Sequence, residues 1–137
     1  MNVKPDLDTR SGIDRLMVAF YAKATTDDLI GEFFTDVVPF DLRHHLPVIG
    51  DFWESVLLGT QAYRKHNRSP LQLHAELDAL EPLHPEHFDR WLELFRETVD
   101  ELFTGPRADF AKLRSAMIAK RMLDVIAASR LAATASR

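Results

Sequence analysis

Apolar residues recur every three or four positions along most of this chain. That spacing places them on one face of an α-helix, whereas a strand would need the strict alternation that no segment shows. We expect helices over residues 11–24, 44–58, 69–77, 85–103 and 108–128. Ser11 would cap the first, and Pro47 would lie in the first turn of the second, where its missing N–H costs nothing. The pattern predicts an all-α fold.

Length and composition limit what such a fold can be. A chain of 137 residues has the size of one domain, so we expect a single unit over 1–137, with fraying tails at 1–10 and 129–137. The absence of cysteine excludes disulfides, thiolate metal sites and cysteine nucleophiles. A net charge of −4 without a basic stripe argues against nucleic-acid binding.

The sequence also bears on membranes and location. No apolar run approaches the ~18 residues that span a bilayer, so we expect no membrane insertion. The polar N-terminal segment is unlike a signal peptide. Together these features predict a cytoplasmic protein.

Two adjacent histidines open the second expected helix. Neighbours on a helix diverge by about 100°, while residues four apart share a face. His45 is four before Ile49 and eight before Trp53, so we expect it to point inward and His44 to face water. An inward histidine is either a core side chain bonded to a carbonyl or a functional group.

Other histidines fall on or near apolar faces. His74 lies on the apolar face of the short third helix, which Ser69, Pro70 and Gln72 open as a capping box. His84 is a candidate N-cap of the fourth helix, and His87 precedes Trp91 by four residues. His66 lies in a basic loop and is expected to be solvated.

A cofactor between the helices would explain several inward polar groups at once. His74 could be its ligand, while Tyr21, His45 and Trp91 could direct polar tips into one pocket. Tyrosine and tryptophan bury large apolar bodies but need partners for their O–H and N–H. Plain core packing explains Tyr21 and Trp91 individually, and a cofactor-free helical interaction or regulatory domain explains the periodicity. A non-haem carboxylate metal site would need Glu-x-x-His pairs, which Glu86-His87 does not form.

Four segments, in order, resemble the truncated haemoglobins of the third group. They are "FYAK", "HHLPVIGDFWESVLLG", "SPLQLHAEL" and "PEHFDRWLELFRETVDELF". The resemblance covers about residues 10–128. It implies a shortened globin fold, a two-over-two helical sandwich around haem b.

The resemblance also implies roles for single residues. His74 matches the proximal histidine that binds haem iron, and Tyr21, His45 and Trp91 match the distal residues near the bound ligand. Ile49 and Phe34 match apolar residues that line the haem pocket. The chain departs from the family at Ile30-Gly31-Glu32 and in a longer stretch between His74 and Trp91. That longer stretch keeps His84 and His87 as alternative iron ligands.

The implied function is binding of O₂, NO and CO. Tyr and Trp donors would slow O₂ release, which suits NO dioxygenase- or peroxidase-like chemistry with NO or peroxide better than bulk O₂ transport. Whether the chain is an enzyme stays open. Because the chain has no Rossmann-type glycine motif, electrons would come from a separate reductase. Arg64 and Lys65, in a cationic loop with Arg68, either pair with the haem propionates or remain solvated.

Overall fold

The structure is a computed structural model that describes residues 3–34, 42–66, 74, 78 and 82–135. Every regular element in these ranges is helical, which confirms the all-α prediction. The elements are α1 (Arg10–Ala24), α2 (Leu42–Leu58), the 3₁₀ turn η2 (Ala62–Lys65), α4 (Pro85–Leu102) and α5 (Pro106–Ala135). No helix in the described ranges is long and apolar enough to cross a membrane.

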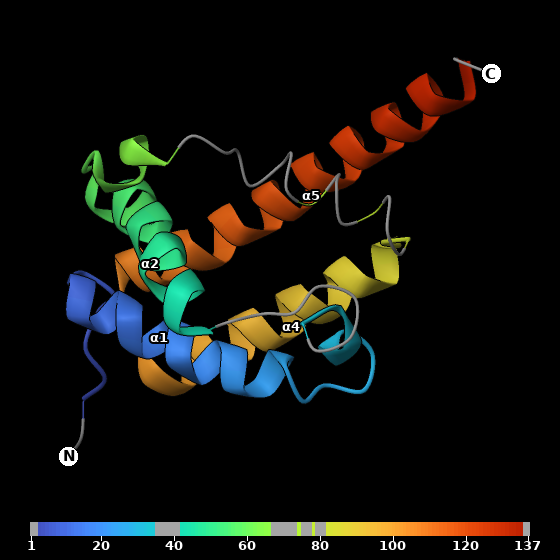
Figure 1. The fold of residues 1–137 in the computed structure, drawn as a ribbon. Coiled ribbons are helices and arrows are strands. Elements are labelled where there is room, and N and C mark those ends of the chain that lie inside the picture. The colour runs from blue at the N-terminus through green and yellow to red at the C-terminus, as the bar shows by residue number, and fades with distance from the viewer. Residues whose placement is uncertain (1–2, 35–41, 67–73, 75–77, 79–81, 136–137) are drawn as a thin grey trace.

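The helices form two interlocking pairs. α1 packs against both α2 and α4, and α4 also packs against α5. Figure 1 shows α2 crossing α1 and the long α5 running diagonally behind, with its C-terminal end projecting beyond the other helices. Gly50 lies where α1 and α2 cross, and an added Cβ would lie 2.6 Å from Arg10 Nη2, so the Arg10 side chain would have to move.

The N-terminus of α1 differs from the sequence prediction. Thr9, not Ser11, is the N-cap: its Oγ1 accepts the backbone N–H of Gly12 at 3.0 Å. Thr9 has the extended backbone that a capping residue needs, whereas Ser11 already lies within the helix. The helix then buries Ile13 and its apolar partners one and two turns further on.

The start of α2 also differs from the prediction. The helix begins at Leu42 rather than near His44, so Pro47 lies in its second turn. There the proline removes the hydrogen bond that its N–H would have made to residue 43. The carbonyl of Pro47 accepts a hydrogen bond from Arg10 Nη2 at 3.2 Å, which links this turn to α1.

The described part of α5 extends to Ala135, and the fraying expected over 129–137 stays a prediction. Arg130 near the end of the helix forms a salt bridge with the buried Asp78, Nη2 to Oδ1 at 2.5 Å. Nothing local predicts this contact, since the two residues are 52 positions apart.

Two of the described N-terminal residues contact the helices. Leu7 is fully buried, and the Asp6 carboxylate accepts the backbone N–H groups of Arg107 and Ala108 at 3.1 and 2.9 Å, which caps α5. Gly105, with a φ of 138°, is needed beside it, because a Cβ there would lie 2.6 Å from Asp6 Cγ.

The large apolar residues of α5 are divided between its two faces. Phe110, Leu113 and Met117 in the first half are exposed, whereas Met122 and Ile126 further along are buried. Small side chains face the core instead, among them Ala111 and Ser115. Small residues allow close contact between helices, and the aromatic side chains of the facing helices already fill the space.

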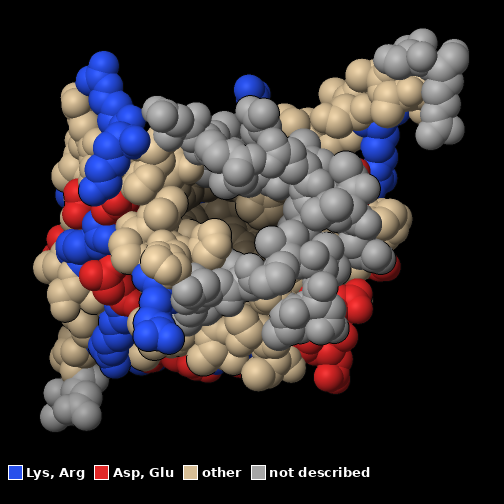
Figure 2. Space-filling view, viewed as in Figure 1, with Lys and Arg blue, Asp and Glu red and all other residues tan. Residues whose placement is uncertain are grey.

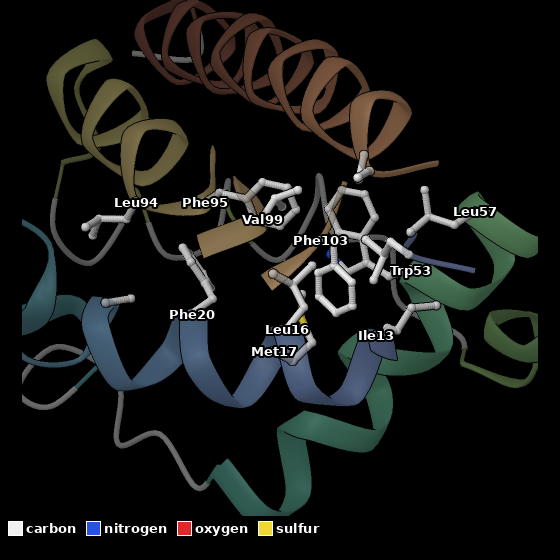
Figure 3. Packing of buried hydrophobic residues seen from close by; sticks show 14 of the residues in the cluster. Ile13, Leu16, Met17, Phe20, Trp53, Leu57, Leu94, Phe95, Val99 and Phe103 are labelled. Atoms are coloured by element: carbon white, nitrogen blue, oxygen red, sulfur yellow. The ribbon is translucent and has the colours of Figure 1, made fainter. Parts of the chain in front are cut away.

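Two apolar clusters form the interior. The larger joins α1, α2 and α4, and Figure 3 shows Phe20, Trp53, Phe95 and Phe103 meeting within it. The smaller lies between α4 and α5 and contains Phe33, Leu83, Phe88, Ala119, Met122 and Ile126. Ile118 packs against both clusters.

Candidate functional site

An aromatic group on α1 and α4 brings together three of the residues predicted for the site. Phe20 lies edge-on to both Tyr21 and Trp91, with ring centroids 5.1 and 5.7 Å apart. The ring of Phe34 lies edge-on to Tyr21 at 5.7 Å, and Trp91 stacks on Phe95 at 5.4 Å. Tyr21 and Trp91 therefore flank the same phenylalanine from two different helices.

Tyr21 is a neutral hydrogen-bond donor in this setting. Burial raises the pKa of its phenol well above the ordinary value of 10.0, because desolvation disfavours the phenolate. The hydroxyl therefore keeps its proton throughout the physiological pH range.

α2 supplies an apolar wall next to this aromatic group. Ile49 is half-buried and packs against the large cluster together with Leu46 and Phe52. His44 and His45 are both exposed, so burial does not separate them as the helical spacing predicts. The inward orientation of His45 thus remains a prediction.

His74 stands against the second cluster. Its side chain is half-buried, and its ring lies 6.4 Å from that of Phe88. Because Phe88 and Trp91 are three apart on α4, that helix links the histidine to the aromatic group. The predicted capping box of Ser69, Pro70 and Gln72 lies outside the described residues.

Asp78, four residues after His74, forms a clamp that sequence reasoning missed. Its buried carboxylate accepts the backbone N–H of Leu83 at 2.7 Å and two guanidinium N–H groups of Arg130. Arg130 also donates to the Leu83 carbonyl at 3.0 Å. Burial would raise the pKa of Asp78, but these hydrogen bonds outweigh it and lower the pKa. These hydrogen bonds hold Asp78 and Leu83 against the end of α5.

His84 and His87 both belong to the start of α4. His84 is the N-cap residue, as predicted, and its backbone N–H donates to Nδ1 of His87 at 2.9 Å. The His87 ring also packs edge-on against Phe33 at 5.0 Å. An imidazole that accepts a hydrogen bond at Nδ1 carries its proton at Nε2 when neutral, so that nitrogen has no lone pair for a metal.

Arg64 and Lys65, the two cations predicted for the propionates, each contact a nearby side chain. Lys65 Nζ lies 3.2 Å from Asp51 Oδ2, and Arg64 donates to Gln61 Oε1 at 3.1 Å. Arg68, the third cation of this loop, lies outside the described residues.

Asp51 is the centre of an ion-pair network that the sequence did not reveal. Arg10 Nη1 approaches its carboxylate at 2.7 Å and His66 Nε2 at 2.9 Å, so the prediction of a solvated His66 was wrong. Burial would raise the pKa of Asp51, but the hydrogen bonds from His66, Arg10 and Lys65 outweigh it and hold the pKa at about 2. The network joins α1, α2 and η2 on the same helix, α2, that carries the apolar wall of Leu46, Ile49 and Phe52.

The surface is hollowed near these elements. Figure 2 shows a depression near the centre of the face seen in Figure 1, and uncharged residues form its described walls. In the described part of the chain, no three His, Asp or Glu side chains gather as a metal site would require. A metal held by several protein ligands therefore finds no support there.

Comparisons with known proteins agree with this architecture, although no protein-family model matches the chain. A group 3 truncated haemoglobin of Campylobacter jejuni is 29% identical over 120 residues, which cover 85% of this chain and 90% of that protein. The crystal structure of a group III truncated haemoglobin from Campylobacter jejuni matches with a TM-score of 0.77 at 29% identity, over 90% of this chain and 95% of that one.

The paired helices and these likenesses define a shortened globin fold, as the sequence predicts. Within that class, the chain is similar to the truncated haemoglobins of group III, in sequence and in structure.

Proposed function

We propose that residues 1–137 form one haem b-binding globin unit that holds small diatomic ligands beside Tyr21 and Trp91. The observation that carries the proposal is the shared contact of both side chains with Phe20, with ring centroids 5.1 and 5.7 Å apart, which brings two donor-bearing rings to the same phenylalanine. The likeness to truncated haemoglobins supports the same role.

The residues present fit a haem. His74 offers a half-buried imidazole beside the apolar cluster that holds Phe88, and imidazole is the usual proximal ligand of globin haems. His87 suits this task less, because its Nδ1 is engaged by the His84 backbone, and His84 itself is exposed. When bound, haem would supply an iron that His74 holds and that binds a diatomic ligand.

The other residues of the chain would determine how long that ligand stays. The Tyr21 hydroxyl and the Trp91 indole N–H would donate hydrogen bonds to the ligand, while Phe34 and Ile49 would exclude water from the pocket. His45, exposed at the start of α2, serves as a gate. Arg64, exposed and bonded to Gln61, fits a propionate better than Lys65, which already pairs with Asp51.

The expected consequence is slow release of O₂. A hydrogen bond contributes about 0.5–1.5 kcal/mol, and about 1.4 kcal/mol corresponds to a tenfold rate change. Two donors would therefore retain O₂ strongly and suit reactions with NO or peroxide, supported by electrons from a separate reductase. The release of CO would depend less on these donors than the release of O₂, because bound CO carries less negative charge on its oxygen atom.

Stopped-flow measurement of O₂ release tests the proposed donors. We expect Tyr21→Phe and Trp91→Phe to raise the off-rate by about 2- to 13-fold each, with smaller changes for CO. Tyr63→Phe is a matched control, because Tyr63 packs against Phe52 and the adjacent His66. Unchanged O₂ release in both pocket variants would refute the donor roles.

Absorption spectra test the cofactor and its ligand. We expect the purified protein to be coloured, and His74→Ala, but not His84→Ala or His87→Ala, to lose the normal ferrous Soret band. A normal band in His74→Ala with loss in His87→Ala would overturn the assignment. A protein that takes up no haem would favour the cofactor-free helical domain instead.

A further inference from the structure

The outer face of α5 carries an exposed apolar stripe. Phe110, Leu113 and Met117 are 44%, 58% and 51% exposed. At 100° per residue, the three lie within about 60° of one another on the helix surface. Singly exposed apolar residues are ordinary, but a contiguous stripe on one helix marks a contact surface.

Charged residues border the stripe: two pairs of residues can complement each other, while the exposed Arg114 adds a second cation to the flank of Arg121. Asp109 and Lys120 lie on one flank, and Arg121 lies on the other flank beside Phe110. Each of these pairs is eleven positions apart, which brings its members within about 20° of each other around the helix. Lys120 and Arg121 are exposed and form no ion pair within the described part of the chain. Asp109 lies 3.6 Å from Lys112, but that lysine makes its shorter contact, 2.7 Å, with Asp100.

Two copies of this helix complement each other when they run antiparallel. With the two-fold axis at the level of Ser115, Leu113 of one copy faces Met117 of the other. In the same register, Asp109 of one copy lies opposite Lys120 of the other on one flank, which allows a salt bridge. On the other flank, Phe110 of one copy lies opposite Arg121 of the other, which allows a cation–π contact. If the two-fold axis lay one helical turn closer to the C-terminus, Leu113 of one copy would instead lie opposite Asp124 of the other.

We propose that this face of α5 is a self-association surface for a second copy of the chain. Two-fold symmetry makes such an interface isologous, so one stripe and one set of flanking charges suffice. A single helix face covers less than the roughly 800 Å² per partner of a standard interface, so the dimer is weak, with a Kd of about 10–100 μM.

Sedimentation equilibrium of the haem-loaded full chain from about 1 to 500 μM at low salt measures this dimer. We expect Leu113→Gln and Met117→Gln to raise the Kd about tenfold or more, in line with the loss of central apolar contacts. Val18→Gln is the matched control, since Val18 is 53% exposed on α1, away from α5. A chain that is monomeric at every concentration overturns the proposal, as does a dimer that Leu113→Gln leaves unchanged.

A charge swap tests the register. Asp109→Lys and Lys120→Asp should each weaken the dimer, and the double variant should restore it, because the salt bridge is re-formed with reversed sign. Failure of the double variant to recover overturns the proposed pairing. The alternative is that this face binds an anionic membrane. In that case the chain would bind phosphatidylglycerol vesicles, more strongly with Asp109→Lys and more weakly with Lys120→Asp, and the self-association proposal would be overturned.

Discussion

Asp51→Asn should destabilise the fold through the network that joins α1, α2 and η2. The Asp51 carboxyl has a pKa of about 2 in the folded chain, against an ordinary value of 3.8. Such a difference contributes at most about 2.5 kcal/mol at neutral pH. Lys65 is largely exposed and His66 partly so, and solvent screens their contribution. We therefore expect a loss of about 1–2 kcal/mol in the free energy of unfolding.

The effect should depend on pH with a defined sign. Because the folded pKa of Asp51 lies below its ordinary value, the stabilisation is complete well above pH 3.8 and is lost as the pH falls toward 2. Urea unfolding followed by far-UV circular dichroism at pH 7, 5 and 3 measures the difference between wild type and variant. That difference should be constant from pH 7 to 5 and smaller at pH 3.

Asp14→Asn provides the matched control for this experiment. Asp14 also binds Arg10, at 2.8 Å, but its side chain is 54% exposed, so solvent already screens the pair. Its loss should cost only a few tenths of a kcal/mol. If Asp14→Asn cost as much as Asp51→Asn, or if the Asp51 effect were equal at pH 7 and 3, the buried network would not be the cause.

Three further changes test other contacts. Asp78→Ala leaves the buried N–H of Leu83 without its acceptor and should lower the free energy of unfolding by about 1–3 kcal/mol in the same urea assay. Gly31→Ala would place a Cβ 2.9 Å from the carbonyl oxygen of Thr25 and should cost about 1–3 kcal/mol, visible as a lower Tm; an unchanged Tm would mean that this turn yields. Since burial raises the pKa of Tyr21, O₂ release should stay constant between pH 6 and 9, and acceleration toward pH 9 would contradict a neutral donor.

Helical periodicity and the cap and stop residues determined much of the fold in advance. The apolar spacing located α1, α2 and α4 closely, because a helix repeats every 3.6 residues and the signal is local. Pro85 after His84 placed the start of α4 correctly. The same periodicity indicated Tyr21 and Trp91 as inward residues, and their shared contact with Phe20 agrees with that.

Contacts between distant segments were decided only in the tertiary structure. Asp51 and Asp78 meet Arg10 and Arg130 across 41 and 52 positions, and a charged residue in a sequence carries no mark of its partner. These partners turned two acidic residues into buried anchors, because a buried carboxylate requires compensating donors. Near the candidate site, these contacts hold Asp51 of α2 against α1 and Asp78 against the end of α5.

The orientation of α5 shows the same limit. Its sequence contains a large apolar set, with Phe110 among it, and a small set, with Ala111 and Ala119 among it, and periodicity alone favours burial of the large one. The structure buries the small residues in the first half of α5 and the larger Met122 and Ile126 only further along, because the first half lies close to helices whose aromatic side chains already occupy the interior. A sequence determines which residues share a face of a helix, but the shape of the neighbouring helices decides which face is buried.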